Sequence, residues 1–179
     1  SDPHIRYDRL SKRWFVVAIE VNPLFENNLI FLAVSDVGKI TSSSSFTFHS
    51  CNSSLFPYDP SAPYAPFLDY PTLGVDRNAV VIGGNQFGYD SLTNVGYVID
   101  KNKLLHGKLI VYPFELGVYN FINGTVGGMY TPQGVTNDDG TAKNSFFTGI
   151  TYFHDGLVIA KLRYNEKHEP ILTAEYTVP

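Results

Sequence analysis

The fold is decided by the stretch Pro71-Thr72-Leu73-Gly74-Val75-Asp76-Arg77-Asn78-Ala79-Val80-Val81-Ile82-Gly83-Gly84-Asn85. In this stretch a proline is followed five positions later by an acid, and then by a turn and an apolar strand. The same order occurs at residues 3–8, before the apolar run 14–19, and at residues 132–137, before the run 146–150. The three prolines recur at intervals of roughly 60–70 residues, which indicates an internal repeat. We call residues 3–8, 71–76 and 132–137 the three repeat segments.

Strand-forming runs rich in β-branched and aromatic residues follow each repeat segment, and no stretch has a sustained helical period. The chain is therefore predicted to be all-β. Four-stranded antiparallel units repeated along a chain are typical of a β-propeller, with one unit per blade. We expect three blades, at about residues 1–50, 69–114 and 129–179, within a single domain spanning residues 1–179. A β-sandwich is the alternative that the same strand pattern permits. The expected further strands are 13–21, 29–35, 44–49, 79–87, 95–99, 109–114, 145–152, 157–164 and 171–178.

Two long connections interrupt this pattern. Residues 51–69 interleave prolines with aromatic residues, and residues 115–128 are rich in glycine and aromatic residues. Long irregular loops are often functional, so the rim that these two loops form is the predicted binding surface.

Three blades are too few for a ring, because closed propellers have roughly four to eight. The missing blades are expected from a longer parent chain or, as the alternative, from a second copy. The chain begins at Ser1 without an initiator methionine. We therefore expect a processed protein or a fragment of a longer one, and we favour the parent chain as the source of the missing blades.

Composition excludes several classes of protein. With 44% hydrophobic and 15% aromatic residues the chain is not expected to be disordered. A net charge of −4 gives no basic face for nucleic acid. The single cysteine, Cys51, cannot form a disulfide within the chain. No apolar run is long enough for a membrane span.

The chain resembles a family of exported bacterial β-propellers that are loosely sialidase-like in fold and mostly uncharacterised. The resemblance rests on residues 2–8, 13–15, 32–35 and 69–76, supported by Asn85-Gln86-Phe87 and by residues 101–105 followed by Gly107. It implies an extracellular, cell-surface or periplasmic location and a place inside a larger propeller. It implies little about activity, because one fold serves many functions.

Acidic residues near the expected strand starts are the main candidates for chemistry. A pair drawn from Asp2, Asp8, Asp69 and Asp76 would suit glycoside hydrolysis, which uses two carboxylates. The favoured interpretation is that each acid caps a turn by accepting hydrogen bonds from backbone amides nearby. His4, Tyr7, Tyr70 and Asn85 are, in the same way, either channel-lining ligands or packing residues.

Other functional signals are weaker. Asn137, Asp138 and Asp139 precede Gly140 and offer oxygens to a calcium ion, although a plain Asp-Gly turn is the favoured interpretation. No histidines have the spacing of a zinc site. A sialidase needs clustered arginines to hold a carboxylate, whereas Arg9 and Arg77 occupy equivalent turn positions.

We therefore predict a non-catalytic binding module whose ligand is an unknown protein or glycan. Its binding residues are Asp2, His4, Tyr7, Asp69, Tyr70 and Asn85. A sialidase-like hydrolase with acids at the channel mouth and a purely structural repeat of a large surface protein are the alternatives.

Overall fold

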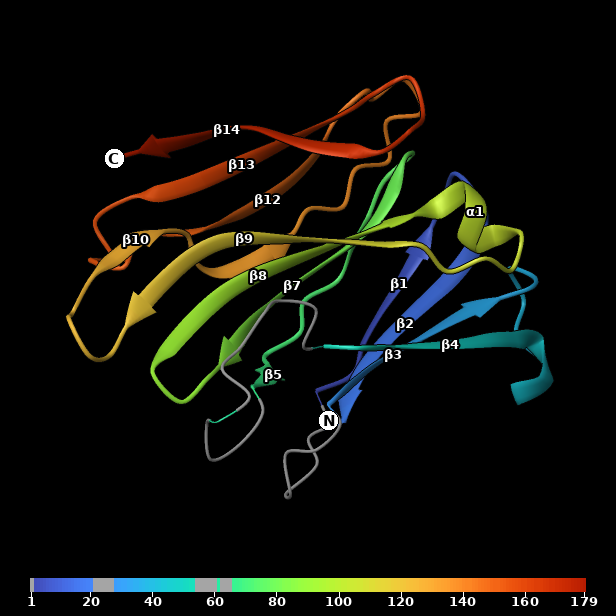
Figure 1. Ribbon diagram of the computed structural model, residues 1–179. Coiled ribbons are helices and arrows are strands. Elements are labelled where there is room, and N and C mark those ends of the chain that lie inside the picture. The colour runs from blue at the N-terminus through green and yellow to red at the C-terminus, as the bar shows by residue number, and fades with distance from the viewer. Residues whose placement is uncertain (1, 21–27, 54–60, 62–65) are drawn as a thin grey trace.

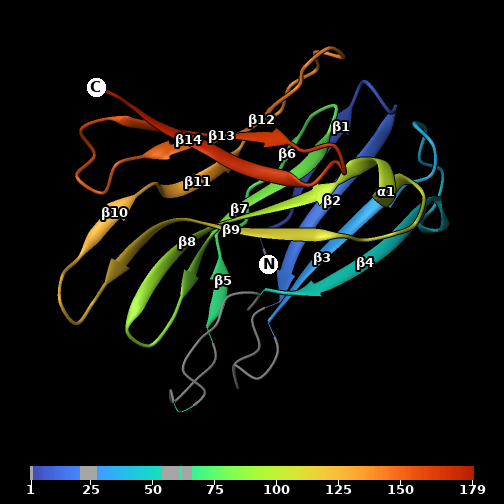
Figure 2. The same ribbon diagram turned by 45° about the horizontal axis from the view of Figure 1, so that its top comes forward.

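The computed structural model describes residues 2–20, 28–53, 61 and 66–179, and it consists largely of β-strands. The described strands form three antiparallel sheets, none of which closes on itself. The predicted all-β class is confirmed. The second sheet lies between the first and the third (Figures 1 and 2).

The first sheet is a four-stranded meander that begins with the first repeat segment. Its strands pair in chain order and are β1 (His4–Asp8), β2 (Arg13–Glu20), β3 (Leu29–Ser35) and β4 (Phe46–Asn52). A short 3₁₀ turn, η1 (Ser43–Ser45), precedes β4, so the last strand begins and ends later than the sequence indicates.

The second sheet is larger than expected. Its strands are β5 (Phe67–Asp69), β6 (Gly74–Val75), β7 (Ala79–Phe87), β8 (Ser91–Asp100), β9 (Val111–Asn120) and β10 (Val126–Gly128). Both β5 and β6 pair with β7, one with each half of that strand. They are separate because Tyr70, between them, has a φ of 57° and turns the chain out of the extended conformation. Of the second repeat segment, residues 71–76, only the two residues of β6 form a strand.

Two further expectations fail in this sheet. Residues 115–128 are not an irregular connection, since they hold the second half of β9 and all of β10. A helix, α1 (Lys101–Leu105), lies between β8 and β9. Its N-cap is Asp100, whose carboxylate accepts a hydrogen bond from the Lys103 amide at 3.0 Å. Of the other long connection, residues 51–69, the greater part lies outside the described residues.

The third sheet repeats the meander of the first. Its strands pair in chain order and are β11 (Tyr130–Gly134), β12 (Ser145–Ile150), β13 (Leu157–Tyr164) and β14 (Pro170–Val178).

Apolar cores fill both gaps between the sheets. One core joins buried residues of the first sheet, such as Phe15 and Val17, to Val80 and Ile82 of β7. The other joins residues of the second sheet to Phe147 and its neighbours in the third. The burial patterns reflect this order, since β7 is buried at all positions except its last. In β2 and β12 buried positions largely alternate with half-buried ones, as in sheets that are covered on one face.

Candidate functional site

The three repeat segments share the same end. Asp8 accepts a hydrogen bond from the Leu10 amide at 3.1 Å, and Asp76 accepts one from the Asn78 amide at 2.7 Å. Asn137 accepts one from the Asp139 amide at 2.9 Å. In each case the side chain caps the turn two residues further on. The turn-capping interpretation of Asp8 and Asp76 is confirmed.

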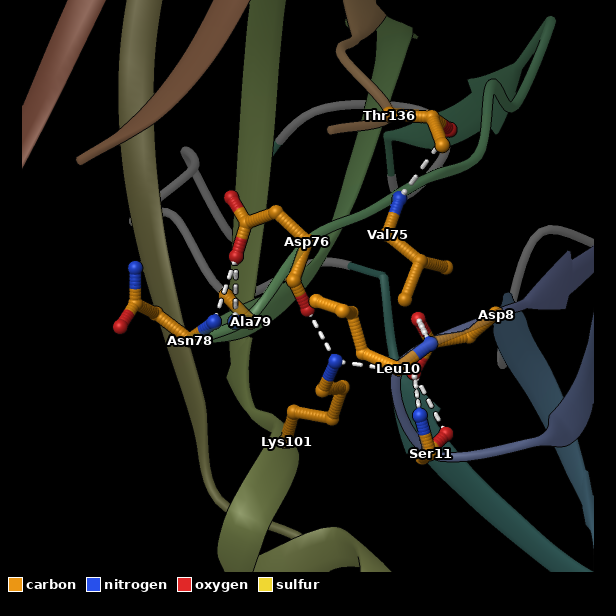
Figure 3. A network of polar contacts seen from close by, with 9 residues as sticks. All are labelled: Asp8, Leu10, Ser11, Val75, Asp76, Asn78, Ala79, Lys101 and Thr136. Atoms are coloured by element: carbon orange, nitrogen blue, oxygen red, sulfur yellow. Dashed lines mark hydrogen bonds and ion pairs between the residues drawn. The ribbon is translucent and has the colours of Figure 1, made fainter. Parts of the chain in front are cut away.

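A buried lysine joins two of these turns (Figure 3). The Nζ atom of Lys101, at the start of α1, lies 2.9 Å from Oδ2 of Asp8 and also donates to the main-chain oxygen of Asp76. The Lys101 and Asp8 side chains are only 6% and 1% exposed. This ion pair therefore links the first sheet to the second inside the protein, where both charges have lost their water.

The two carboxylates of this network have opposite pKa shifts. Burial alone would raise the pKa of Asp8, but hydrogen bonds from Ser11 and Lys101, with the Lys101 charge, hold it below its usual value. Burial raises the pKa of Asp76 despite its hydrogen bonds from Ser145, Ala79 and Asn78. The pKa shifts differ because Asp76 is the more deeply buried of the two carboxylates. The Lys101 charge lowers the pKa of both, but Lys101 donates a side-chain hydrogen bond only to the carboxylate of Asp8.

The third turn meets the other two at the same end of the molecule. The Asn137 amide donates to the main-chain oxygen of Val75 at 3.0 Å, and the Val75 amide donates to Thr136 Oγ1 at 3.3 Å (Figure 3). Arg9 lies 3.6 Å from Asp138, and Arg77 donates to the Gly140 oxygen at 2.7 Å. The two equivalent arginines thus reach the third turn rather than a shared ligand site.

The candidate calcium ligands take part in this turn. Asn137 caps it, Asp138 faces Arg9, and Asp139 accepts hydrogen bonds from the amide and hydroxyl of Thr141 at 2.8 and 2.7 Å. Among the residues that the structure describes, no group of three or more His, Cys, Asp or Glu side chains is placed to hold a metal ion. Calcium binding at this turn stays a prediction.

A pocket of about 490 Å³ opens where the repeat segments begin, and each segment contributes to its lining the residue at the same position. His4, Thr72 and Gln133 each directly follow the repeat proline. The residues before the three prolines, Asp2, Tyr70 and Thr131, have φ values of 46°, 57° and 48°. This left-handed conformation is uncommon outside glycine, so its recurrence shows that the backbone itself repeats. The pocket is lined by Asp2, Pro3, His4, Tyr70, Thr72 and Gln133.

Thr72 fixes the pocket wall between the second and third sheets. Its hydroxyl accepts hydrogen bonds from the Gly83 and Gly134 amides, both at 3.1 Å, and donates to the Pro132 oxygen at 3.0 Å. Gly83 allows this close approach, because a Cβ atom there would lie 2.1 Å from the Pro132 oxygen.

The structure brings three of the six predicted binding residues into this pocket, namely Asp2, His4 and Tyr70. Tyr7 lies against Trp14, with ring centroids 4.9 Å apart. Asp69 accepts a hydrogen bond from the Tyr70 amide at 2.9 Å and stands opposite Asn85 in the β5–β7 pair. Asn85 is buried, and among the described residues its Oδ1 atom has no hydrogen-bond partner.

Sequence reasoning missed Thr72 and Gln133 as pocket residues and Lys101 as the bridge. The first two could have been found from the repeat, since both occupy the position of His4. Lys101 carried no comparable signal, because a lysine after an aspartate in a polar connection is ordinarily a solvated residue.

The chain matches no protein-family model, no curated protein and no solved structure. In the described part of the chain, no helix has the length and apolar character needed to cross a membrane.

Proposed function

We propose that the three sheets are successive blades of a β-propeller and that the chain is a non-catalytic module that binds a glycan in the pocket at the repeat prolines. One observation carries the proposal: His4, Thr72 and Gln133, at one position of the three repeat segments, line a single pocket. In a propeller the first strands of the blades surround a central channel, so equivalent positions converge in this way.

The pocket has the chemistry of a sugar site. Tyr70 is 60% exposed and offers an aromatic face to the C–H groups of a sugar ring. His4, Thr72, Gln133 and Asp2 supply polar groups that can hydrogen-bond to hydroxyls. Its volume of about 490 Å³ is within the range of small-ligand sites.

The lining favours binding over hydrolysis. Glycosidases generally use two carboxyl groups flanking the scissile bond, whereas the described lining holds the single carboxylate of Asp2 and no arginine. Asp8 and Asp76 are committed to turns and to the Lys101 network. We place the module outside the cell, in line with the exported family that the sequence resembles.

A glycan array followed by titration calorimetry tests this proposal. We expect the wild-type chain to bind at least one neutral glycan, and Tyr70→Asn to weaken binding at least tenfold. Asparagine removes the ring but tolerates the left-handed conformation of residue 70. Tyr89→Asn is the matched control, because Tyr89 is 61% exposed and does not line the pocket. Absence of glycan binding by the wild type, or equal binding by Tyr70→Asn, would refute the proposal.

A further inference from the structure

The two outer sheets each leave one apolar face open. In the first sheet, the paired residues Ile5, Val16, Ala33 and Phe48 form a row across all four strands. Phe48 is 71% exposed and Ile5 50% exposed, and the row contains no charged residue. We call this the N-terminal face; it is completed by Tyr7, Trp14 and Phe31.

The third sheet has a comparable face on the side away from the second sheet. Ile150, Leu157 and Val178 form one cross-strand row, and Ile159 pairs with Tyr176 beside it. Leu157 and Tyr176 are more than half exposed. We call this the C-terminal face; Phe146 and Lys161 extend it.

Repeat-equivalent residues show what normally covers each face. Counted from the repeat segments through the strand registers, Val16, Ile82 and Phe147 occupy one position in the second strand of their sheets. Ile82 and Phe147 are fully buried against the preceding sheet, but Val16 is only half-buried. The N-terminal face is thus a surface that, at its two equivalents, is covered by another sheet of this chain.

The C-terminal face shows the complementary difference, on the side that points toward a following sheet. Phe15, Val81 and Phe146 occupy the neighbouring position, which points toward the following sheet. Phe15 and Val81 are fully buried there, whereas Phe146 is half-buried. The chain forms this face-to-face contact twice, and each of its two open faces corresponds in repeat position to one side of that contact.

We propose that these faces pair between two copies of the 179-residue chain, head to tail, so that the N-terminal face of each copy packs on the C-terminal face of the other. Two copies bring six sheets together, within the roughly four to eight blades that close a propeller ring. Head-to-tail contacts of this kind close into a ring when the rotation between subunits allows it.

Light scattering on the full chain, over a hundredfold range of concentration, tests the pairing. We expect a dimer, and we expect Phe48→Glu and Tyr176→Glu each to raise the dissociation constant at least tenfold. Both side chains are mostly exposed within one chain, so these variants should fold. Phe153→Glu is the control, because Phe153 is 76% exposed and lies in the turn after β12, outside both faces.

Mixing the two variants tests the orientation. A head-to-tail dimer of Phe48→Glu with Tyr176→Glu keeps one intact contact, so the mixture should dimerise more tightly than either variant alone. A wild-type chain that stays monomeric throughout would overturn the proposal and leave the faces to another partner. A dimer that resists Tyr176→Glu would equally overturn it, since the N-terminal faces would then pair with each other. Neither variant changes the pocket, so failure here is separable from failure of glycan binding.

Discussion

Replacing Lys101 by methionine should destabilise the protein strongly. The change keeps most of the side-chain volume but leaves the Asp8 carboxylate, 1% exposed, without its cation. Breaking a buried ion pair by removing one partner costs about 3–5 kcal/mol. Asp8 keeps hydrogen bonds from Leu10 and Ser11, which favours the lower end of that range. We therefore expect a loss of about 3 kcal/mol, or a fall in Tm of roughly 6–12 °C for a domain of this size.

The assay is urea unfolding at pH 7 and one protein concentration, followed through Trp14, the single tryptophan. Lys103→Met is the matched control, because the Lys103 side chain is 38% exposed and its partner Asp100, 3.3 Å away, keeps its hydrogen bond from the amide of residue 103. It should cost less than about 1 kcal/mol. Adding Asp8→Asn to Lys101→Met removes the stranded charge and should restore part of the lost stability.

The refuting result is a Lys101→Met variant no less stable than Lys103→Met. That outcome would mean that Lys101 leaves the interior at little cost and that the first and second sheets are held by their apolar core alone. Equal stability of the single and double variants would refute the narrower claim that the unpaired Asp8 charge causes the loss.

Three further predictions follow from other contacts. The lowered pKa of Asp8 contributes stability above the unfolded-state pKa of about 3.9, and this contribution is lost as pH falls through the lower folded-state value. The raised pKa of Asp76 acts oppositely, costing stability as pH rises above that same value. In acid titrations of unfolding free energy, the penalty of Asp8→Asn should therefore shrink as pH falls below about 4. Asp76→Asn should gain stability relative to wild type as pH rises. Parallel curves for the two variants would contradict both assignments. Gly83→Ala should cost at least about 2 kcal/mol in urea unfolding, because its Cβ would lie 2.1 Å from the Pro132 oxygen. Gly127→Ala is the control: its added Cβ atom would have no heavy atom within 4 Å, so it should change stability by less than about 0.5 kcal/mol. Equal losses of stability in the Gly83 and Gly127 variants would show that the sheets can move apart at Gly83. Burial raises the pKa of the Cys51 thiol to about 11, so at pH 8 it should react with a disulfide reagent roughly 100-fold more slowly than the urea-unfolded chain; a native rate equal to the unfolded rate would place Cys51 in solvent.

The sequence predicted strands well where a strand is decided by its own apolar residues. Strands 29–35, 79–87 and 157–164 have the predicted bounds, because each is a long run that packs on a neighbouring sheet. Prediction failed where a single backbone angle or cap decides the structure. The left-handed φ of Tyr70 separates β5 from β6, and the Asp100 cap begins a helix too short to show a period.

For the candidate site, too, the sequence predicted the local features but not the contacts between distant residues. The repeat located both ends of the segments, but it did not show which end faces solvent. The acids at the turns suggested a shared ligand site. In the structure Asp8 and Asp76 accept hydrogen bonds from backbone amides, and Asp8 also pairs with Lys101. That arrangement depends on a residue far from the repeat segments in sequence, so no local pattern could indicate it.

The two ends of the repeat segments therefore have different roles. At the turn end, Asp8, Asp76 and Lys101 are engaged with one another and with the adjacent backbone. At the proline end, Thr72 holds the second and third sheets together while His4, Gln133 and Tyr70 keep polar and aromatic surface around a pocket. Through Lys101, the turn end joins the first sheet to the second, and such a rigid support helps to keep the lining of the pocket at the proline end in place. Mutations at Lys101 should accordingly weaken the proposed glycan binding as well as stability, whereas Tyr70→Asn should affect the proposed binding alone.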